Sequence, residues 1–155
     1  MTNHGCRYAI LGLVALGLLS GCGEKHTSTA HEAQGGGHSH VAPHGGTLTE
    51  IGEHAFNVEW VRDAGQGSLD AYILDGHAEN FVRLPLPAFS IILESQPTPL
   101  TLAAVASPQT GETVGNTSHF RVQSDAIKGT NGISGEIKGL EIRGQIFDKV
   151  KFILP

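Results

Sequence analysis

Apolar and polar residues alternate along short stretches from Thr47 onward, and this two-residue period constrains the fold more than any other feature. Three such stretches place apolar side chains at every second position: Phe56, Val58 and Trp60; Leu69, Ala71 and Ile73; Val150, Phe152 and Leu154. Successive side chains of a strand point to opposite faces, so each stretch predicts a strand with one buried face. Phe56 and Trp60 are therefore expected in the core.

The rest of this region also favours strands. No segment has a sustained helical period with caps at both ends, and 125–128 offers at most one helical turn. Asp63–Gly67 and Asp75-Gly76 are typical of turns, and Pro85 and Pro87 indicate an edge strand or a loop. We predict an all-β domain over residues 47–155, a single antiparallel β-sandwich of about seven short strands. A small open barrel is the alternative.

One hairpin is also expected near the end of the chain. Two apolar stretches, 133–137 and 140–146, are separated by Lys138-Gly139. A short glycine-containing connection between two strand-like stretches is typical of a β-hairpin. We therefore predict that these two stretches pair with each other.

The first 21 residues have the layout of a secretory signal. Arg7 supplies positive charge, 8–19 is a twelve-residue apolar segment, and Ser20 and Gly21 are small. The apolar segment is shorter than the roughly 20 residues that cross a bilayer. Leu19-Ser20-Gly21-Cys22 resembles a bacterial lipobox, which implies cleavage before Cys22 and acylation of Cys22, with palmitate among the acyl chains. An ordinary signal that ends by chance at a cysteine is the alternative.

Lipidation of Cys22 has consequences for the mature chain. The other cysteine, Cys6, lies in the leader, so the mature chain has no thiol pair for a disulfide and its core must hold by packing. Acylation predicts a protein anchored to the cell envelope by lipid. Gly23 stands where an aspartate marks inner-membrane retention in well-known lipoproteins, which favours the outer membrane, facing the periplasm.

The charged residues exclude one class of partner. The chain has 15 Asp and Glu against 10 Lys and Arg, a formal net charge of −5 at pH 7. The basic residues are scattered, whereas nucleic-acid binding needs clustered Lys and Arg to neutralise phosphates. We therefore expect no nucleic-acid partner.

Residues 22–46, which follow the signal, are rich in glycine and histidine and lack the aliphatic residues needed for a core, so we predict a disordered tether. Residues two apart on an extended chain project to the same side, so His38 and His40 are placed to hold one ion, and flexible glycines let His44 join them. His26 and His31 are supplementary candidates, and His54 and His77 in the domain are weaker ones. Neutral imidazole suits Cu, Zn or Ni. The alternative is that these histidines are solvated spacers.

Catalytic motifs are absent from the sequence. No Gly-x-Ser-x-Gly elbow, zinc-protease motif, phosphate-binding loop or dinucleotide fingerprint occurs, and no cysteine remains as a nucleophile. We predict that the protein is not an enzyme.

Two segments carry a resemblance to a family. Pro43-His44-Gly45-Gly46 with the following 47–52, and then 69–78, resemble small bacterial His-rich lipoproteins with this PHGG-type motif. They are similar also to segments that accompany periplasmic adaptor subunits of heavy-metal efflux systems. The resemblance covers about 35 residues and implies a membrane-tethered β-domain linked with metal handling.

These observations lead to one expectation and one alternative. We expect a lipid-anchored envelope protein that binds or buffers a divalent transition metal through its tether histidines, accessory to a metal-efflux partner. The alternative is a non-catalytic β-sandwich module that binds another envelope protein, with incidental histidines.

Overall fold

The computed structural model describes residues 40–129 and 131–155. The predicted leader, Cys22, and the tether histidines His26, His31 and His38 lie outside the described residues. Within the described part of the chain, no helix is long and apolar enough to cross a membrane.

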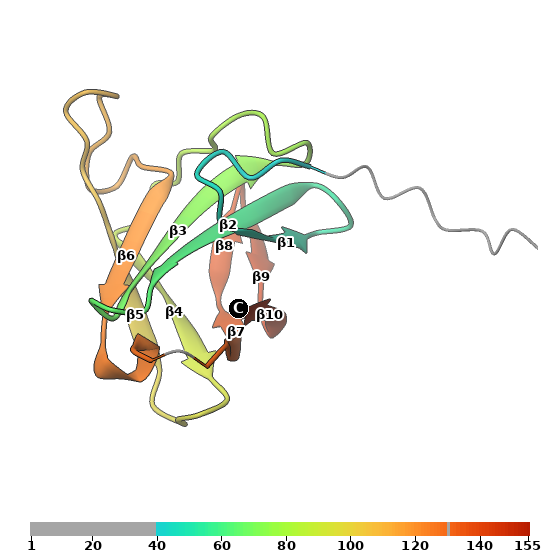
Figure 1. The fold of residues 1–155 in the computed structure, drawn as a ribbon. Helices are drawn as coiled ribbons and strands as arrows, with labels where there is room; N and C mark the ends of the chain where they lie inside the picture. The colour runs from blue at the N-terminus through green and yellow to red at the C-terminus, as the bar shows by residue number, and fades with distance from the viewer. Residues whose placement is uncertain (1–39, 130) are drawn as a thin grey trace, which may run out of the picture. The chain divides into compact units, whose positions relative to one another are not determined.

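Short strands make up most of the described chain, which confirms the all-β prediction (Figure 1). Their bounds are β1 Thr47–Ile51, β2 Phe56–Asp63, β3 Ser68–Asp75, β4 Ala88–Leu93, β5 Leu100–Ala104, β6 His119–Gln123, β7 Ile133–Lys138, β8 Leu140–Ile142, β9 Gln145–Phe147 and β10 Val150–Leu154. A single 3-10 turn, η1, spans Asp125–Ile127, where at most one helical turn was expected. There are ten strands against about seven predicted, and one of the additional strands arises because the predicted strand 140–146 divides into β8 and β9.

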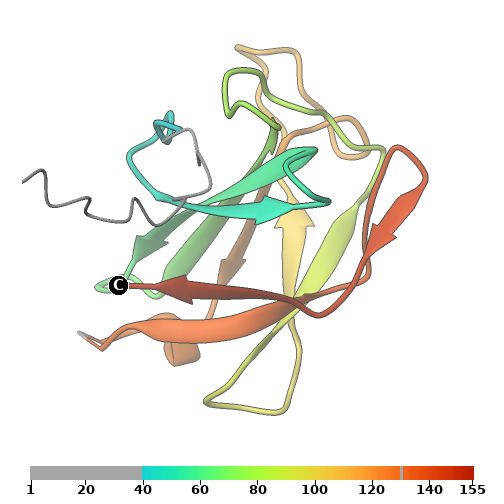
Figure 2. The same ribbon diagram turned by 90° about the vertical axis from the view of Figure 1, so that its right-hand side faces the viewer.

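Eight of the strands form one antiparallel sheet in the order β1-β2-β3-β6-β5-β4-β7-β10, and β8 and β9 form a separate pair. The large sheet curls until its two end strands, β1 and β10, approach each other, so that it nearly closes into a barrel (Figure 2). The arrangement combines the two predicted possibilities, because a strongly curled sheet packs one half of its inner face against the other half, as a sandwich does.

The inner face of the curled sheet carries the core. Val58, Trp60, Ile73 and Phe120 are each at most 1 % exposed, as the alternation predicted for β2 and β3. The Trp60 ring packs on Phe152, with centroids 4.6 Å apart, and thus joins β2 to β10 across the nearly closed barrel. The described domain therefore holds by apolar packing.

The predicted hairpin of 133–146 is wrong. β7 pairs with β10 on one side and with β4 on the other, while β8 pairs only with β9. Gly139 has a φ of 62°, and the chain turns there out of the large sheet into the small hairpin. β7 is a central strand, so the backbone N–H and C=O groups of both its edges need partners. β10 supplies the partners on one edge, and β4, which is distant in sequence, supplies them on the other.

Arg62 ties the end of the chain to β2. Its guanidinium donates hydrogen bonds to the carbonyl oxygens of Ile127, Gly129, Asn131 and Pro155. The planar, multi-donor guanidinium suits such a set of acceptors, which a lysine ammonium cannot match in geometry.

Candidate functional site

The outer face of β2, β3 and β6 carries polar side chains that loops cover. Glu59 lies opposite Tyr72, and Tyr72 lies opposite His119, so the three form a row across the strands. Asp70 and Arg121 lie opposite each other in the next row. Glu59 is fully buried and Asp70 is 6 % exposed, although the alternation alone predicts that they face solvent.

The Pro43–Gly46 motif covers Glu59. One carboxylate oxygen, Oε1, accepts the backbone N–H groups of His44, at 2.7 Å, and of Gly46, at 3.0 Å. The other oxygen, Oε2, lies 2.9 Å from Nδ1 of the His44 ring. A Cβ on Gly46 would overlap the carbonyl oxygen of Trp60, so only glycine permits this close approach to β2. These three contacts compensate the desolvation of the buried carboxyl group.

Two imidazole rings enclose the Tyr72 ring. His44 stacks on it with centroids 3.8 Å apart and planes inclined by 16°, and His119 stacks on it at 4.3 Å and 15°. Burial, with the nearby Asp70 charge, raises the pKa of the Tyr72 phenol, so the hydroxyl stays protonated at neutral pH. The result is a three-ring stack, His44–Tyr72–His119, that presents ring edges bearing a hydroxyl and imidazole nitrogens.

Asp70 orients the His119 imidazole of this stack. Its Oδ1 contacts Nε2 of His119 and accepts a 2.6 Å hydrogen bond from Nε of Arg121. Burial alone would raise the pKa of Asp70, but the hydrogen bonds and charges of His119 and Arg121 outweigh it and lower the pKa. Because a carboxylate can only accept, His119 carries a proton on Nε2. The same reasoning places a proton on Nδ1 of His44.

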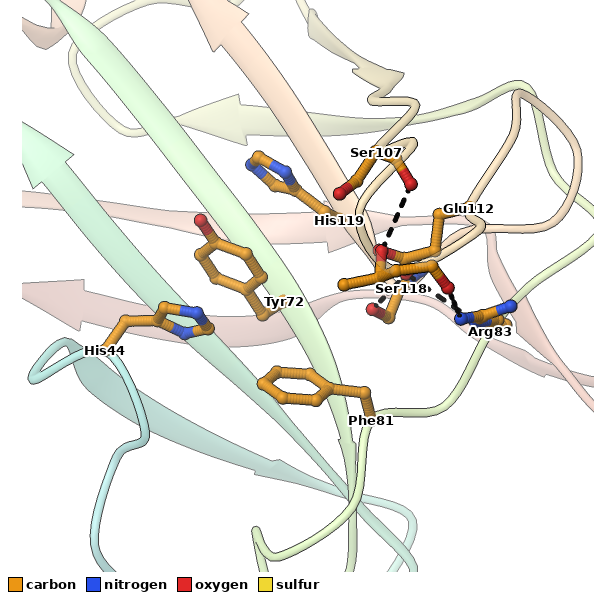
Figure 3. Close-up of a pocket in the computed structure, with 9 residues that line it drawn as sticks. His44, Tyr72, Phe81, Arg83, Ser107, Glu112, Ser118 and His119 are labelled. Carbon is orange, nitrogen blue, oxygen red and sulfur yellow. Dashed lines mark hydrogen bonds and ion pairs between the residues drawn. The ribbon is translucent and has the colours of Figure 1, made fainter.

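A cavity of about 360 Å³ lies beside the three-ring stack (Figure 3). The ring stack and Phe81 line one side, and a polar group lines the other: Arg83, Ser107, Thr110, Glu112 and Ser118. Glu112 is 9 % exposed; Ser118 donates to it through its backbone N–H and its hydroxyl, and Thr110 through its hydroxyl. Burial opposes these hydrogen bonds, but together with Arg83 they lower the pKa of Glu112.

A second group of side chains lies at the start of the described chain. The His40 and His77 rings meet edge to face, with centroids 5.9 Å apart. Asn57 donates to the carbonyl oxygens of Asp75 and Gly76 and so fixes the turn that carries His77. A Cβ on Gly76 would overlap the His54 carbonyl oxygen, so this turn packs directly on the turn between β1 and β2.

The predicted site residues therefore have different positions. His40 lies beside His77, while His44 is held by Glu59, and His54 is exposed with its Nδ1 2.8 Å from a Glu50 oxygen. Residues 40–46 were predicted to belong to the disordered tether, but two of them, His44 and Gly46, contact Glu59 of the domain. Between His40 and Pro155, residue 130 excepted, no three His, Cys, Asp or Glu side chains are grouped so as to hold a metal ion.

Sequence reasoning missed the cavity and the row beneath it. Glu59, Asp70 and Tyr72 alternate with buried residues of β2 and β3 and therefore look like solvent-facing positions. Only the loops folded over them make them a site. The sequence offers one weak signal, the histidine at the start of β6, His119.

Comparisons with known proteins give no identity: no family model, no curated protein and no solved structure matches the chain. The resemblance of the PHGG-type motif to His-rich lipoproteins therefore stays a prediction.

Proposed function

We propose that this is a non-catalytic, lipid-anchored protein of the cell envelope that binds or buffers a divalent transition metal, Cu, Zn or Ni, and acts with a metal-efflux partner. The anchor is Cys22, in an outer membrane facing the periplasm. The ligands come from the histidines around the junction between the tether and the domain.

The observation that carries this proposal is the proximity of His40 and His77. A zinc–nitrogen bond measures about 2.0–2.1 Å, so two imidazoles that share one ion have ring centroids about 5–6 Å apart. The 5.9 Å separation of these two rings falls in that range. His77 belongs to the turn fixed by Asn57, so one ligand is held by the domain and the other by the segment that leads to the tether.

Two imidazoles alone leave a tetrahedral site incomplete. His38 precedes His40 by two residues and supplies the third nitrogen of this proposal, with His26 and His31 as further donors. His44 has its Nδ1 directed to Glu59, and in this proposal it anchors the segment that brings His40 to His77. Ligation by histidine nitrogen alone favours copper over zinc on affinity.

Titration calorimetry with Zn(II) and with Cu(II) at pH 7 tests the ligand set. We expect His40→Ala/His77→Ala to weaken binding at least about tenfold, since each variant side chain removes one metal–nitrogen bond. His54→Ala is the matched control, because His54 is an exposed histidine whose imidazole pairs with Glu50. Equal affinity of the double variant and the wild type would remove His40 and His77 from the site.

A triple variant distinguishes the domain from the tether. If His26→Ala/His31→Ala/His38→Ala abolishes binding while the double variant retains it, the tether alone holds the metal. Loss in both sets supports a site shared between tether and domain.

The second candidate is a non-catalytic interaction module with incidental histidines. The cavity beside Tyr72 favours it, because its polar lining serves no purpose in metal binding at His40 and His77.

A further inference from the structure

Each carboxyl group at the cavity beside the three-ring stack already has partners within the protein. Glu59 contacts the His44 imidazole, and Asp70 contacts both His119 and Arg121. Glu112 accepts three hydrogen bonds and lies 3.9 Å from Nε of Arg83. An ionic ligand would have to displace one of these internal partners, at the cost of leaving a buried charge unpaired.

Uncharged hydrogen-bonding atoms nevertheless line the cavity. Among the described residues, the Tyr72 hydroxyl has no hydrogen-bond partner, and the Ser107 hydroxyl has only a long contact of 3.4 Å to Gln109. Nε2 of His44 and Nδ1 of His119 are the ring nitrogens that do not face a carboxyl group, because the opposite nitrogens contact Glu59 and Asp70. Donors and acceptors thus lie close together, as a ligand with several hydroxyl groups requires.

One aromatic surface on the cavity is exposed. The Phe81 side chain is among the large apolar side chains that solvent reaches, at 48 % exposure, and it lies 5.5 Å from His44 and 6.3 Å from Tyr72 between ring centroids. Val82 and Leu84, which follow Phe81, are buried. The backbone N–H of Val82 donates to Ile73 of β3, and that of Leu84 donates to Thr117. Phe81 is therefore held in place while its ring remains available for contact with a ligand.

We propose that this cavity binds an uncharged saccharide, one hexose unit or the end of a glycan. Hydroxyl groups both donate and accept, which matches the phenol, the hydroxyl of Ser107 and the two imidazole nitrogens that do not face a carboxyl group. The C–H face of a sugar ring packs on Phe81. The volume of about 360 Å³ lies at the small end of the roughly 300–1,000 Å³ range of ligand pockets, which limits the bound part to a small unit.

Chemical-shift titration of the ¹⁵N-labelled protein tests this proposal. The probes are the methyl β-glycosides of glucose, galactose and N-acetylglucosamine, each to 50 mM, with benzoate and choline as charged probes of similar size. We expect at least one glycoside to shift the amides of Ser118 and His119 saturably, with a millimolar dissociation constant. Binding of benzoate or choline in place of the glycosides, or no shift with any glycoside, would overturn the proposal.

Two variants locate the binding. Tyr72→Phe keeps the ring stack and removes only the hydroxyl, so we expect about a 3- to 10-fold rise in the dissociation constant. Phe81→Ala removes the exposed ring and is expected to weaken binding by a similar factor. Ile153→Ala, at a 77 % exposed position on β10 outside the cavity lining, is the control and should leave affinity unchanged. An unchanged affinity in both cavity variants would place the saccharide elsewhere.

Discussion

Replacement of Glu59 tests how the PHGG-type motif is held on the domain. Its Oε1 accepts two backbone N–H groups, and its Oε2 faces Nδ1 of His44. Glu59→Gln keeps an oxygen for the two N–H groups and places an amide NH₂ against Nδ1. It therefore removes one charge-assisted hydrogen bond, and because His44 is 38 % exposed we expect a loss of about 1–2 kcal/mol in the free energy of unfolding.

Glu59→Ala removes more. The N–H groups of His44 and Gly46 lose their acceptor, and each buried donor without a partner costs about 1–3 kcal/mol, so we expect a total loss of about 3–5 kcal/mol. Urea denaturation of the purified protein measures both values. With a urea m-value of about 2 kcal/mol/M, the midpoint should fall by about 0.5–1 M for the glutamine variant and about 1.5–2.5 M for alanine.

The matched control is Glu141→Gln, at an exposed glutamate of β8, which should leave the midpoint unchanged within about 0.2 M. A double-mutant cycle with His44→Ala isolates the contact between imidazole and carboxyl group and should give a coupling of about 1 kcal/mol. If the alanine and glutamine variants unfold at the same urea concentration, or the coupling is zero, the motif is not held by Glu59.

Three further changes have defined outcomes. Asp70→Asn should lower the free energy of unfolding at pH 7 and flatten its pH dependence. The native pKa of Asp70 lies below its unfolded value, so the stabilisation by Asp70 is present above the unfolded pKa and is lost as the pH falls through the native pKa. Denaturation at pH 7, 5 and 3 detects this loss. Arg62→Lys keeps the charge but loses the fork of N–H donors, so it should reduce the free energy of unfolding by about 1–3 kcal/mol. Urea denaturation measures this loss, and an unchanged midpoint would show that the carbonyl contacts of Arg62 add nothing to stability. Gly76→Ala should force the turn that carries His77 away from His54. We therefore expect weaker Zn(II) binding in calorimetry, and unimpaired binding would count against a fixed position for His77.

The sequence predicted the inner face of the sheet well but not its pairing. The alternation of Phe56, Val58 and Trp60 is a local property of one strand, and the structure buries all three. The partner of β7 is β10, and no local pattern distinguishes that pairing from a hairpin with the residues just after Gly139. Strand pairing depends on which edges the whole sheet leaves open.

The candidate site was harder to predict for a related reason. His40 and His77 are separated by 36 intervening residues, and their rings meet only in the folded domain. The motif around His44 was noticed in the sequence, but its role as a cover for Glu59 depends on a carboxyl group fifteen residues later. Spacing along the chain carries no information about such contacts.

Anomalous X-ray scattering at the zinc edge, from crystals of the protein grown with Zn(II), shows directly whether His40 and His77 share a metal ion. We expect a peak between the His40 and His77 rings, within about 2.0–2.1 Å of one nitrogen of each, which disappears in crystals of His40→Ala/His77→Ala. A zinc peak at other residues, with His40 and His77 free of metal, would contradict it.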